Sequence, residues 1–258
     1  MQLFYKEYGE GKPLIIAHGL LGSSGNWHTL ASRAFSKEGS VFTVDLRNHG
    51  QSPHHPRMDY HSMSEDVAAF IEEHQLAPTN VLGHSMGGKV MMQLALSRPE
   101  LVDRLIVVDV APRAYEDRHE AILDALQAID PDSFSSREEV DRELEKRIPS
   151  YPVRQFLLKN LRYTPEEGYS WQMNLEAING SYDDIAGPVT AKGVFTGLAL
   201  FVRGGSSDYL LPEDEEEIRR SFPKARFETI EGAGHWVHAE TPDRFAATVT
   251  DFLNDQSD

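Results

Sequence analysis

Short apolar runs recur along the first half of the chain and are separated by polar or glycine-containing segments. Each run is largely apolar rather than alternating, which is typical of strands buried on both faces of a sheet. Four predicted strands cover residues 14–17, 41–44, 80–82 and 105–108. This pattern predicts a parallel sheet with both faces covered.

Segments with helical periodicity lie between these strands. Ser62 and Glu65 have the spacing of a capping box and precede an apolar stretch, so a helix is expected to begin at Ser62. Residues 86–97 are rich in helix formers and stop before Pro99. The alternation of strands and helices predicts an α/β fold with a doubly wound, mostly parallel sheet.

The pattern changes after residue 112. Residues 113–187 are charged, have helical periodicity, are interrupted by prolines and contain no strand-like run. We interpret them as an inserted helical cap, or lid, between two parts of the core, residues 1–112 and 188–258. Large apolar side chains in the cap suggest an apolar pocket for an acyl group; they are Phe134, Tyr151, Phe156, Leu157, Leu158 and Trp171.

The α/β pattern resumes after the predicted cap. Strands are predicted at 198–202 and 227–230, with a helix from Pro212 between them. A last helix is expected to open at Thr241, with Pro242 at its first position.

Composition excludes several classes of function. The chain of 258 residues has 25 Lys and Arg against 41 Asp and Glu, a formal net charge of −16. This balance argues against a nucleic-acid partner or an anionic membrane surface. The absence of cysteine excludes disulfides, thiolate metal sites and cysteine nucleophiles. No run is long enough for a membrane helix and no secretory signal is present, so a cytoplasmic location is expected.

The strongest candidate for chemistry is the segment Gly83–His84–Ser85–Met86–Gly87. It follows a predicted strand and opens a predicted helix, the context in which G-x-S-x-G forms a nucleophile elbow. Such a tight turn leaves little room for side chains beside the serine. The pattern predicts Ser85 as a nucleophile raised above the sheet, at the positive end of a helix dipole.

Acyl transfer also needs two N–H groups directed at the developing oxyanion. One comes from the residue after the nucleophile, here Met86. The segment His18–Gly19–Leu20–Leu21–Gly22 follows the first apolar strand, and its Leu20 amide is predicted to be the second donor.

Histidine is suited to act as the general base. His235 lies on a loop of small residues after the last predicted strand, from which it is expected to reach Ser85. His238 follows three residues later, but no third ligand lies nearby, so a metal site is not predicted. Other histidines lie in polar stretches and are expected to face solvent; they are His54, His55, His61, His74 and His119.

The acid that orients the histidine is expected between Ser85 and His235 in the chain, at the end of a strand. Asp45 precedes the serine and is assigned a structural role. Asp109 and Asp208 both meet the conditions, and the residues alone leave both open.

With these motifs in place, the chain resembles the α/β-hydrolase superfamily, and more closely the bacterial YbfF-type esterases and their mitochondrial relatives. The resemblance rests on four segments covering residues 45–52, 83–89, 108–112 and 232–238. It implies an α/β-hydrolase fold with a helical cap, Ser85 as nucleophile and His235 as base. It favours Asp109 as the acid, with Asp208 as the alternative.

These features predict a serine esterase that hydrolyses short- to medium-chain carboxylic esters through an acyl-enzyme, without cofactor or metal. Ser85 excludes the covalent chemistry of dehalogenases and epoxide hydrolases, which have aspartate at this position. An acyl-CoA thioesterase is an alternative, with Arg113, Arg118, Lys146 and Arg147 as phosphate contacts. A carbon–carbon hydrolase, an eliminating synthase and a ligand receptor without turnover are further alternatives on the same fold.

Overall fold

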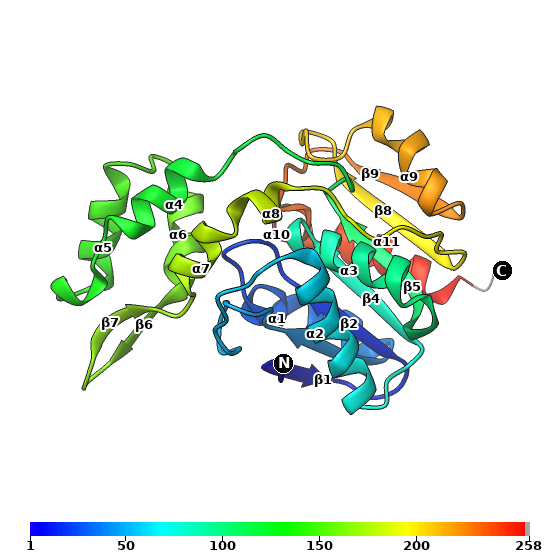
Figure 1. The fold of residues 1–258 in the computed structure, drawn as a ribbon, viewed down its shortest axis with the longest axis horizontal. Helices are drawn as coiled ribbons and strands as arrows, with labels where there is room; N and C mark the ends of the chain where they lie inside the picture. The colour runs from blue at the N-terminus through cyan, green and yellow to red at the C-terminus, as the bar shows by residue number, and fades with distance from the viewer. Residues whose placement is uncertain (256–258) are drawn as a thin grey trace.

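The computed structural model describes residues 1–255, and its centre is a seven-stranded sheet (Figure 1). The strand order is β1-β3-β2-β4-β5-β8-β9, with β1 antiparallel to β3 and the other pairs parallel. The strands are β1 (Tyr5–Tyr8), β2 (Pro13–Ala17), β3 (Ser40–Val44), β4 (Thr79–His84), β5 (Val102–Val108), β8 (Leu198–Gly204) and β9 (Ala225–Ile230). The predicted α/β fold is thereby confirmed. Strand β1 is not predicted by the apolar pattern because its residues are only half-buried or exposed.

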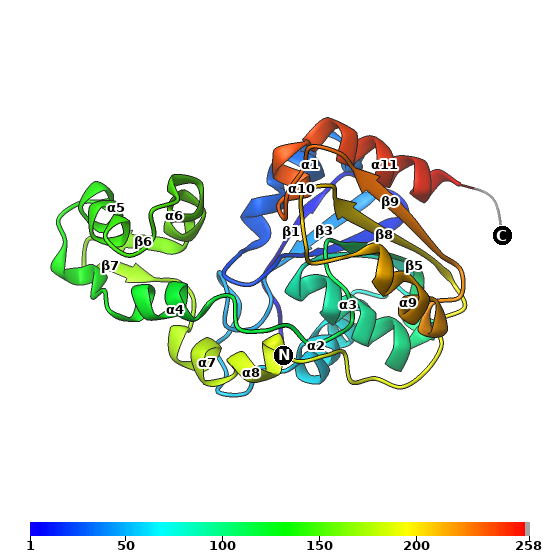
Figure 2. The same cartoon turned by 90° about the horizontal axis from the view of Figure 1, so that it is seen from above.

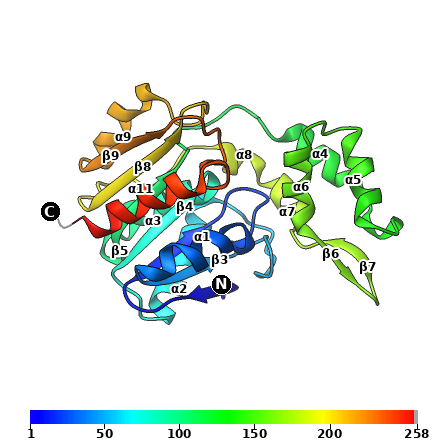
Figure 3. The same cartoon turned by 180° about the vertical axis from the view of Figure 1, so that it is seen from behind.

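Helices cover both faces of the sheet, as Figure 2 shows from above. On one face lie α2 (Tyr60–Glu73), α3 (Met86–Ser97) and α9 (Glu215–Ser221). On the other lie α1 (His28–Arg33), α10 (Val237–Glu240) and α11 (Pro242–Asn254), with α1 and α11 in front in Figure 3. The two layers make separate apolar clusters, which explains why the parallel strands are apolar on both sides.

The start of α2 differs from the prediction. The helix begins at Tyr60, and its N-cap is Asp59, whose carboxylate accepts a hydrogen bond from the Ser62 N–H at 2.7 Å. Ser62 lies within the first turn, so the predicted start at this residue is wrong by two positions. The aspartate satisfies an amide at the end of the helix that has no intrahelical partner.

The elements between β5 and β8 extend to one side of the sheet (Figure 1). They include α4 (Glu120–Gln127), α5 (Arg137–Glu145), α6 (Tyr151–Leu157), α7 (Leu175–Gly180) and α8 (Tyr182–Ala186). Contrary to the expectation of helices alone, β6 (Leu161–Thr164) and β7 (Gly168–Trp171) form an antiparallel hairpin. None of their residues is fully buried, so they lack the apolar pattern that reveals core strands. The turn covers residues 165–167 and leads into Gly168, with φ of +68°. The Tyr163 and Tyr169 rings pair across the hairpin at 4.9 Å.

None of the helices in residues 1–255 combines the length and apolarity needed to cross a lipid bilayer.

Candidate active site

Ser85 occupies a sharp turn between β4 and α3. Its φ of +53° and ψ of −120° lie outside the usual regions for an L-residue. The turn depends on Gly83, because a Cβ there would lie 2.1 Å from the Gly87 carbonyl oxygen. The Ser85 N–H donates to the Val108 carbonyl of β5 at 2.9 Å. The serine therefore stands at the carboxyl edge of the sheet and at the N-terminus of a twelve-residue helix.

His235 and Asp109 meet at the same edge. The His235 Nδ1 lies 2.8 Å from Oδ2 of Asp109, whose side chain is fully buried. The other carboxylate oxygen of Asp109, Oδ1, accepts the Gly204 N–H at 2.9 Å, and the Ser207 hydroxyl donates to Oδ2. These donors fix the direction of the carboxylate toward the imidazole.

Asp208, the alternative acid, lies elsewhere. Its carboxylate contacts the Arg118 guanidinium at 2.6 Å and is 70% exposed. The hydrogen bond from Arg118 keeps the pKa of Asp208 below its usual value. Asp45 likewise has partners of its own, since its two oxygens accept the Ser24 and Gln51 amides at 2.6 and 2.8 Å.

The segment after β2 lies close to Ser85. Leu20 and Met86 both line a cavity with Ser85, and neither backbone N–H has a hydrogen-bond acceptor within residues 1–255. The neighbouring Leu21, at φ of +59°, donates its N–H to Nε2 of His49 at 3.1 Å. The turn thus leaves the Leu20 amide available beside the serine.

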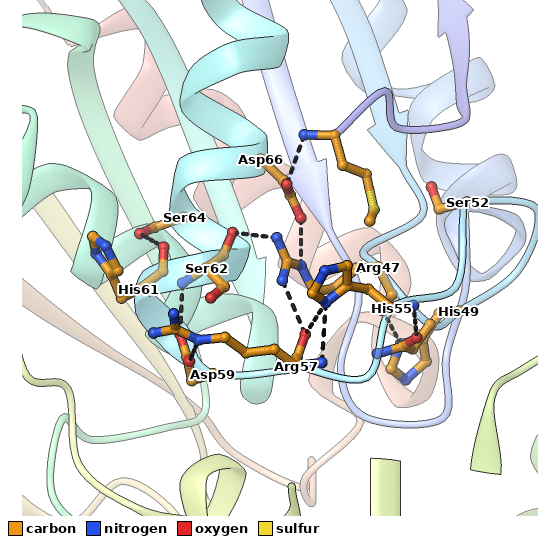
Figure 4. A network of polar contacts seen from close by, with 12 residues as sticks. Arg47, His49, Ser52, His55, Arg57, Asp59, His61, Ser62, Ser64 and Asp66 are labelled. Atoms are coloured by element: carbon orange, nitrogen blue, oxygen red, sulfur yellow. Dashed lines mark hydrogen bonds and ion pairs between the residues drawn. The ribbon is translucent and has the colours of Figure 1, made fainter. Parts of the chain in front are cut away.

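A buried network holds the supporting loop in place (Figure 4). Arg47 donates from Nε to Asp66 at 2.6 Å and from its terminal nitrogens to the carbonyls of Arg57 and Ser62 at 2.9 and 3.0 Å. The chain's amino terminus binds the same Asp66 at 2.8 Å. The network fixes the loop that carries His49, and so the turn at Leu21.

Two cavities meet at Ser85. The first, termed cavity A, is lined by Ser85, His235, the segment 18–21 and apolar residues of the inserted region. The second, termed cavity B, is lined by Ser85, Met86 and Lys89 and by four tyrosines. Of the six cap residues expected to form an acyl pocket, Phe156 and Leu157 line cavity A, whereas the other four line neither cavity and Tyr151 is 61% exposed.

Several site residues have no signal in the sequence. His119, expected to face solvent, is half-buried and lines both cavities. Its Nδ1 lies 2.9 Å from the Tyr182 hydroxyl, and burial lowers its pKa to about 4. His74 is also half-buried, whereas the other three histidines expected at the surface are exposed.

Lys89 lies one helical turn after Ser85 and is 1% exposed. Its Nζ donates to the Gly187 carbonyl at 2.6 Å and lies 4.6 Å from the centre of the Tyr115 ring. Burial lowers its pKa to about 7. The lysine ties α3 to the end of the inserted region.

The chain is similar to known proteins over most of its length. The family described as alpha/beta hydrolase fold matches residues 12–242. The mouse (Mus musculus) protein named sn-1-specific diacylglycerol lipase ABHD11 is 39% identical over 249 residues, covering 93% of this chain and 80% of its own. Esterase YbfF of Escherichia coli is 34% identical, covering 94% and 92%. A solved structure titled marine microorganism esterase superimposes with a TM-score of 0.95 at 39% identity, covering 98% and 99%.

The resemblance to YbfF-type esterases is confirmed by these matches. Because the family match covers most of the chain and the relatives align over nearly all of it, the chain belongs to the alpha/beta hydrolase fold family.

Proposed function

We propose that this protein is a serine hydrolase of carboxylic esters, with Ser85 as nucleophile, His235 as general base and Asp109 as the acid that orients it. One observation carries the proposal. The Asp109 carboxylate lies 2.8 Å from Nδ1 of His235, and His235 lines the same cavity as Ser85. A bond at Nδ1 leaves Nε2 of the imidazole free to accept the serine proton.

In the first step, Oγ of Ser85 attacks the ester carbonyl while His235 takes its proton. The oxyanion of the tetrahedral intermediate accepts hydrogen bonds from the Leu20 and Met86 amides, each worth on the order of 3 kcal/mol of transition-state stabilisation. The carbon–oxygen bond then breaks, and His235 returns the proton to the departing alkoxide. The products of this step are the alcohol and an acyl-Ser85 ester.

In the second step, water enters on the side that the alcohol has left. His235 removes its proton, the oxygen attacks the acyl-Ser85 carbonyl, and Ser85 regains its proton as the acid departs. Asp109 stabilises the imidazolium in both steps.

The residues that line the two cavities suggest which half of the substrate each cavity binds. His235 lines cavity A and is not among the residues that line cavity B. Because the general acid must touch the leaving oxygen, we infer that cavity A receives the alcohol. The acyl group then lies in cavity B, between the tyrosines.

We further infer that residues 113–187 act as a cap. Ile122, Val153 and Phe156 come from this region and line cavity A together with the serine. An apolar roof excludes water and favours substrates with an apolar part, so the choice of substrate is expected to depend on this region.

The names of the relatives support an ester substrate, since they are a diacylglycerol lipase and two esterases. An acyl-CoA substrate is less well supported. Of the four basic residues considered for its phosphates, Arg113 and Arg118 pair with Asp214 and Asp208, and Lys146 pairs with Glu143.

The test is the release of p-nitrophenol from p-nitrophenyl acetate, butyrate and octanoate by wild type and Ser85→Ala. We expect turnover by wild type and a loss of at least about 10⁴-fold in the variant, as for other serine triads. A fluorophosphonate should label wild type at Ser85 and leave the variant unlabelled.

Turnover that persists in Ser85→Ala would refute the serine mechanism. A folded wild type that labels but cleaves no ester would instead favour a thioester or carbon–carbon substrate. A protein that neither labels nor cleaves, yet is stabilised by ligand, would favour a receptor.

A further inference from the structure

His238 is a buried polar side chain without a partner, beside the proposed catalytic serine. It lies on α10, three residues after His235, and exposes 7% of its surface. Its Nδ1 is buried and has no hydrogen-bond partner within residues 1–255. Other buried side-chain atoms in the same condition belong to residues that line neither cavity at Ser85, whereas His238 lines cavity A.

Packing fixes the orientation of this ring. The Trp27 indole stacks on one face of the imidazole with 4.3 Å between ring centres and an interplanar angle of 19°. The His84 ring meets it edge-on at 4.7 Å. Held between these rings, the imidazole is not free to turn toward a distant partner.

The ring is neutral at physiological pH. Burial, together with the nearby His235 and Lys159, lowers the pKa of His238 to about 3. A neutral imidazole has one N–H donor and one nitrogen acceptor. It therefore matches a hydroxyl group, which both donates and accepts, better than it matches an anion or a cation.

Cavity A is thus polar at His238 and apolar toward Phe156 and Val153. We propose that His238 is a specificity-determining residue that hydrogen-bonds a hydroxyl on the alcohol half of the substrate. The enzyme then prefers partial esters of polyols to esters of simple alcohols. The proposal rests on the proposed function, which assigns the leaving alcohol to cavity A.

The preference follows from the cost of an unpaired buried polar group. Nδ1 is buried even without a substrate, so the nitrogen that can meet the substrate is Nε2, which is not among the fully buried atoms. An ester of a simple alcohol that fills cavity A buries Nε2 without a partner, whereas a hydroxylated alcohol pairs with it. For one neutral hydrogen bond the difference corresponds to about tenfold in kcat/KM.

The experiment compares 2,3-dihydroxypropyl butyrate with propyl butyrate. Both esters form the same butyryl-enzyme, so a difference in kcat/KM arises from binding and acylation on the alcohol side. Wild type is expected to favour the dihydroxypropyl ester about tenfold. The His238→Phe variant, which keeps a ring against Trp27, should bring the ratio close to one, and His238→Gln should restore part of it.

The change in the ratio between variants is the readout, because it cancels the intrinsic reactivities of the two esters and any loss common to both. The matched control is His74→Phe, another histidine packed among rings, 4.4 Å from Phe70 and away from both cavities. It should keep the wild-type ratio.

Two outcomes would overturn the proposal. The first is a wild type with no preference. The second is a His238→Phe ratio equal to that of wild type; if both esters then lose rate equally, His238 acts on the attacking water or on folding rather than on the alcohol. Failure of the proposed function is separable, because wild type would then show no Ser85-dependent hydrolysis of p-nitrophenyl butyrate.

Discussion

Asp109 reaches His235 across 126 positions of sequence, with its carboxylate 2.8 Å from Nδ1 of the imidazole. The aspartate directly follows β5, whose neighbour β4 leads into Ser85. Its φ of +53° equals that of the serine, so the proposed acid and nucleophile both have a positive φ, uncommon for L-residues, after neighbouring strands. Strain of this kind persists only where the surroundings determine it, and it is frequent at functional sites.

The two aspartates give the first prediction. Asp109→Asn should lower kcat/KM for p-nitrophenyl butyrate by about 10³- to 10⁴-fold, because an amide at this position favours the wrong tautomer of His235. The matched variant Asp208→Asn should stay within about threefold of wild type, since its carboxylate contacts Arg118 at the surface. A larger loss in Asp208→Asn than in Asp109→Asn would instead indicate that Asp208, in the loop after β8, is the acid.

The turn at Ser85 gives a prediction on stability. Gly83→Ala should lower the free energy of unfolding by about 3 kcal/mol, because the new Cβ would lie 2.1 Å from the Gly87 carbonyl oxygen. Gly180→Ala is the control, since a Cβ there has nothing within 4 Å and alanine favours a helix by up to about 1 kcal/mol. Urea unfolding measures both. Equal stability of the two variants would mean that the turn relaxes without cost.

His49 gives a prediction on pH. Burial and the neighbouring His18 lower the pKa of His49 from 6.5 to about 3 in the folded protein. Between these values the unfolded chain binds a proton that the folded chain does not. Stability is therefore lost as the pH falls from about 6.5 toward 3, and His49 alone accounts for about 2 kcal/mol at pH 5.

The measurement is urea unfolding at several pH values between 5 and 6.5. His49→Gln keeps an acceptor for the Leu21 amide and should reduce the slope of stability against pH by about 1 kcal/mol per unit. The exposed His55, changed to glutamine, should leave the slope as in wild type. An unchanged slope in His49→Gln would mean that the histidine is protonated in the folded state.

The proposed cap gives a prediction on substrate size. Phe156 lines cavity A and packs on Trp236 with 5.6 Å between ring centres. Phe156→Ala should lower kcat/KM for hexyl butyrate about tenfold and for methyl butyrate less than threefold, because only the longer alcohol loses apolar contact. Phe134→Ala, in the same region but outside both cavities, should not change the ratio. A loss independent of alcohol length would argue against this assignment of cavity A.

The sequence predicted what depends on local pattern. Apolar strands, the glycines around Ser85 and the start of α11 at Pro242 are each specified by a few adjacent residues. The polar hairpin β6–β7 was missed because its stability depends on pairing rather than on an apolar face.

The site was predicted less completely than the fold. Asp109 and Asp208 are indistinguishable in sequence because both follow a strand, and only the Gly204 amide and the Ser207 hydroxyl orient one of them inward. His119 was expected to face solvent, and His238 was considered only as a metal ligand, because the burial of both depends on elements far away in the chain.

With Asp109 as the proposed acid, the loop after β8 carries no catalytic residue. It contacts the inserted region instead, through Asp208 to Arg118 at 2.6 Å and through the Tyr209 carbonyl to the Tyr115 hydroxyl at 2.5 Å. A chimaera that grafts this region onto another hydrolase would therefore also need the loop, because the region would otherwise lose these two contacts. In this protein the two segments are expected to act as one structural unit, although about ninety positions separate their contacts.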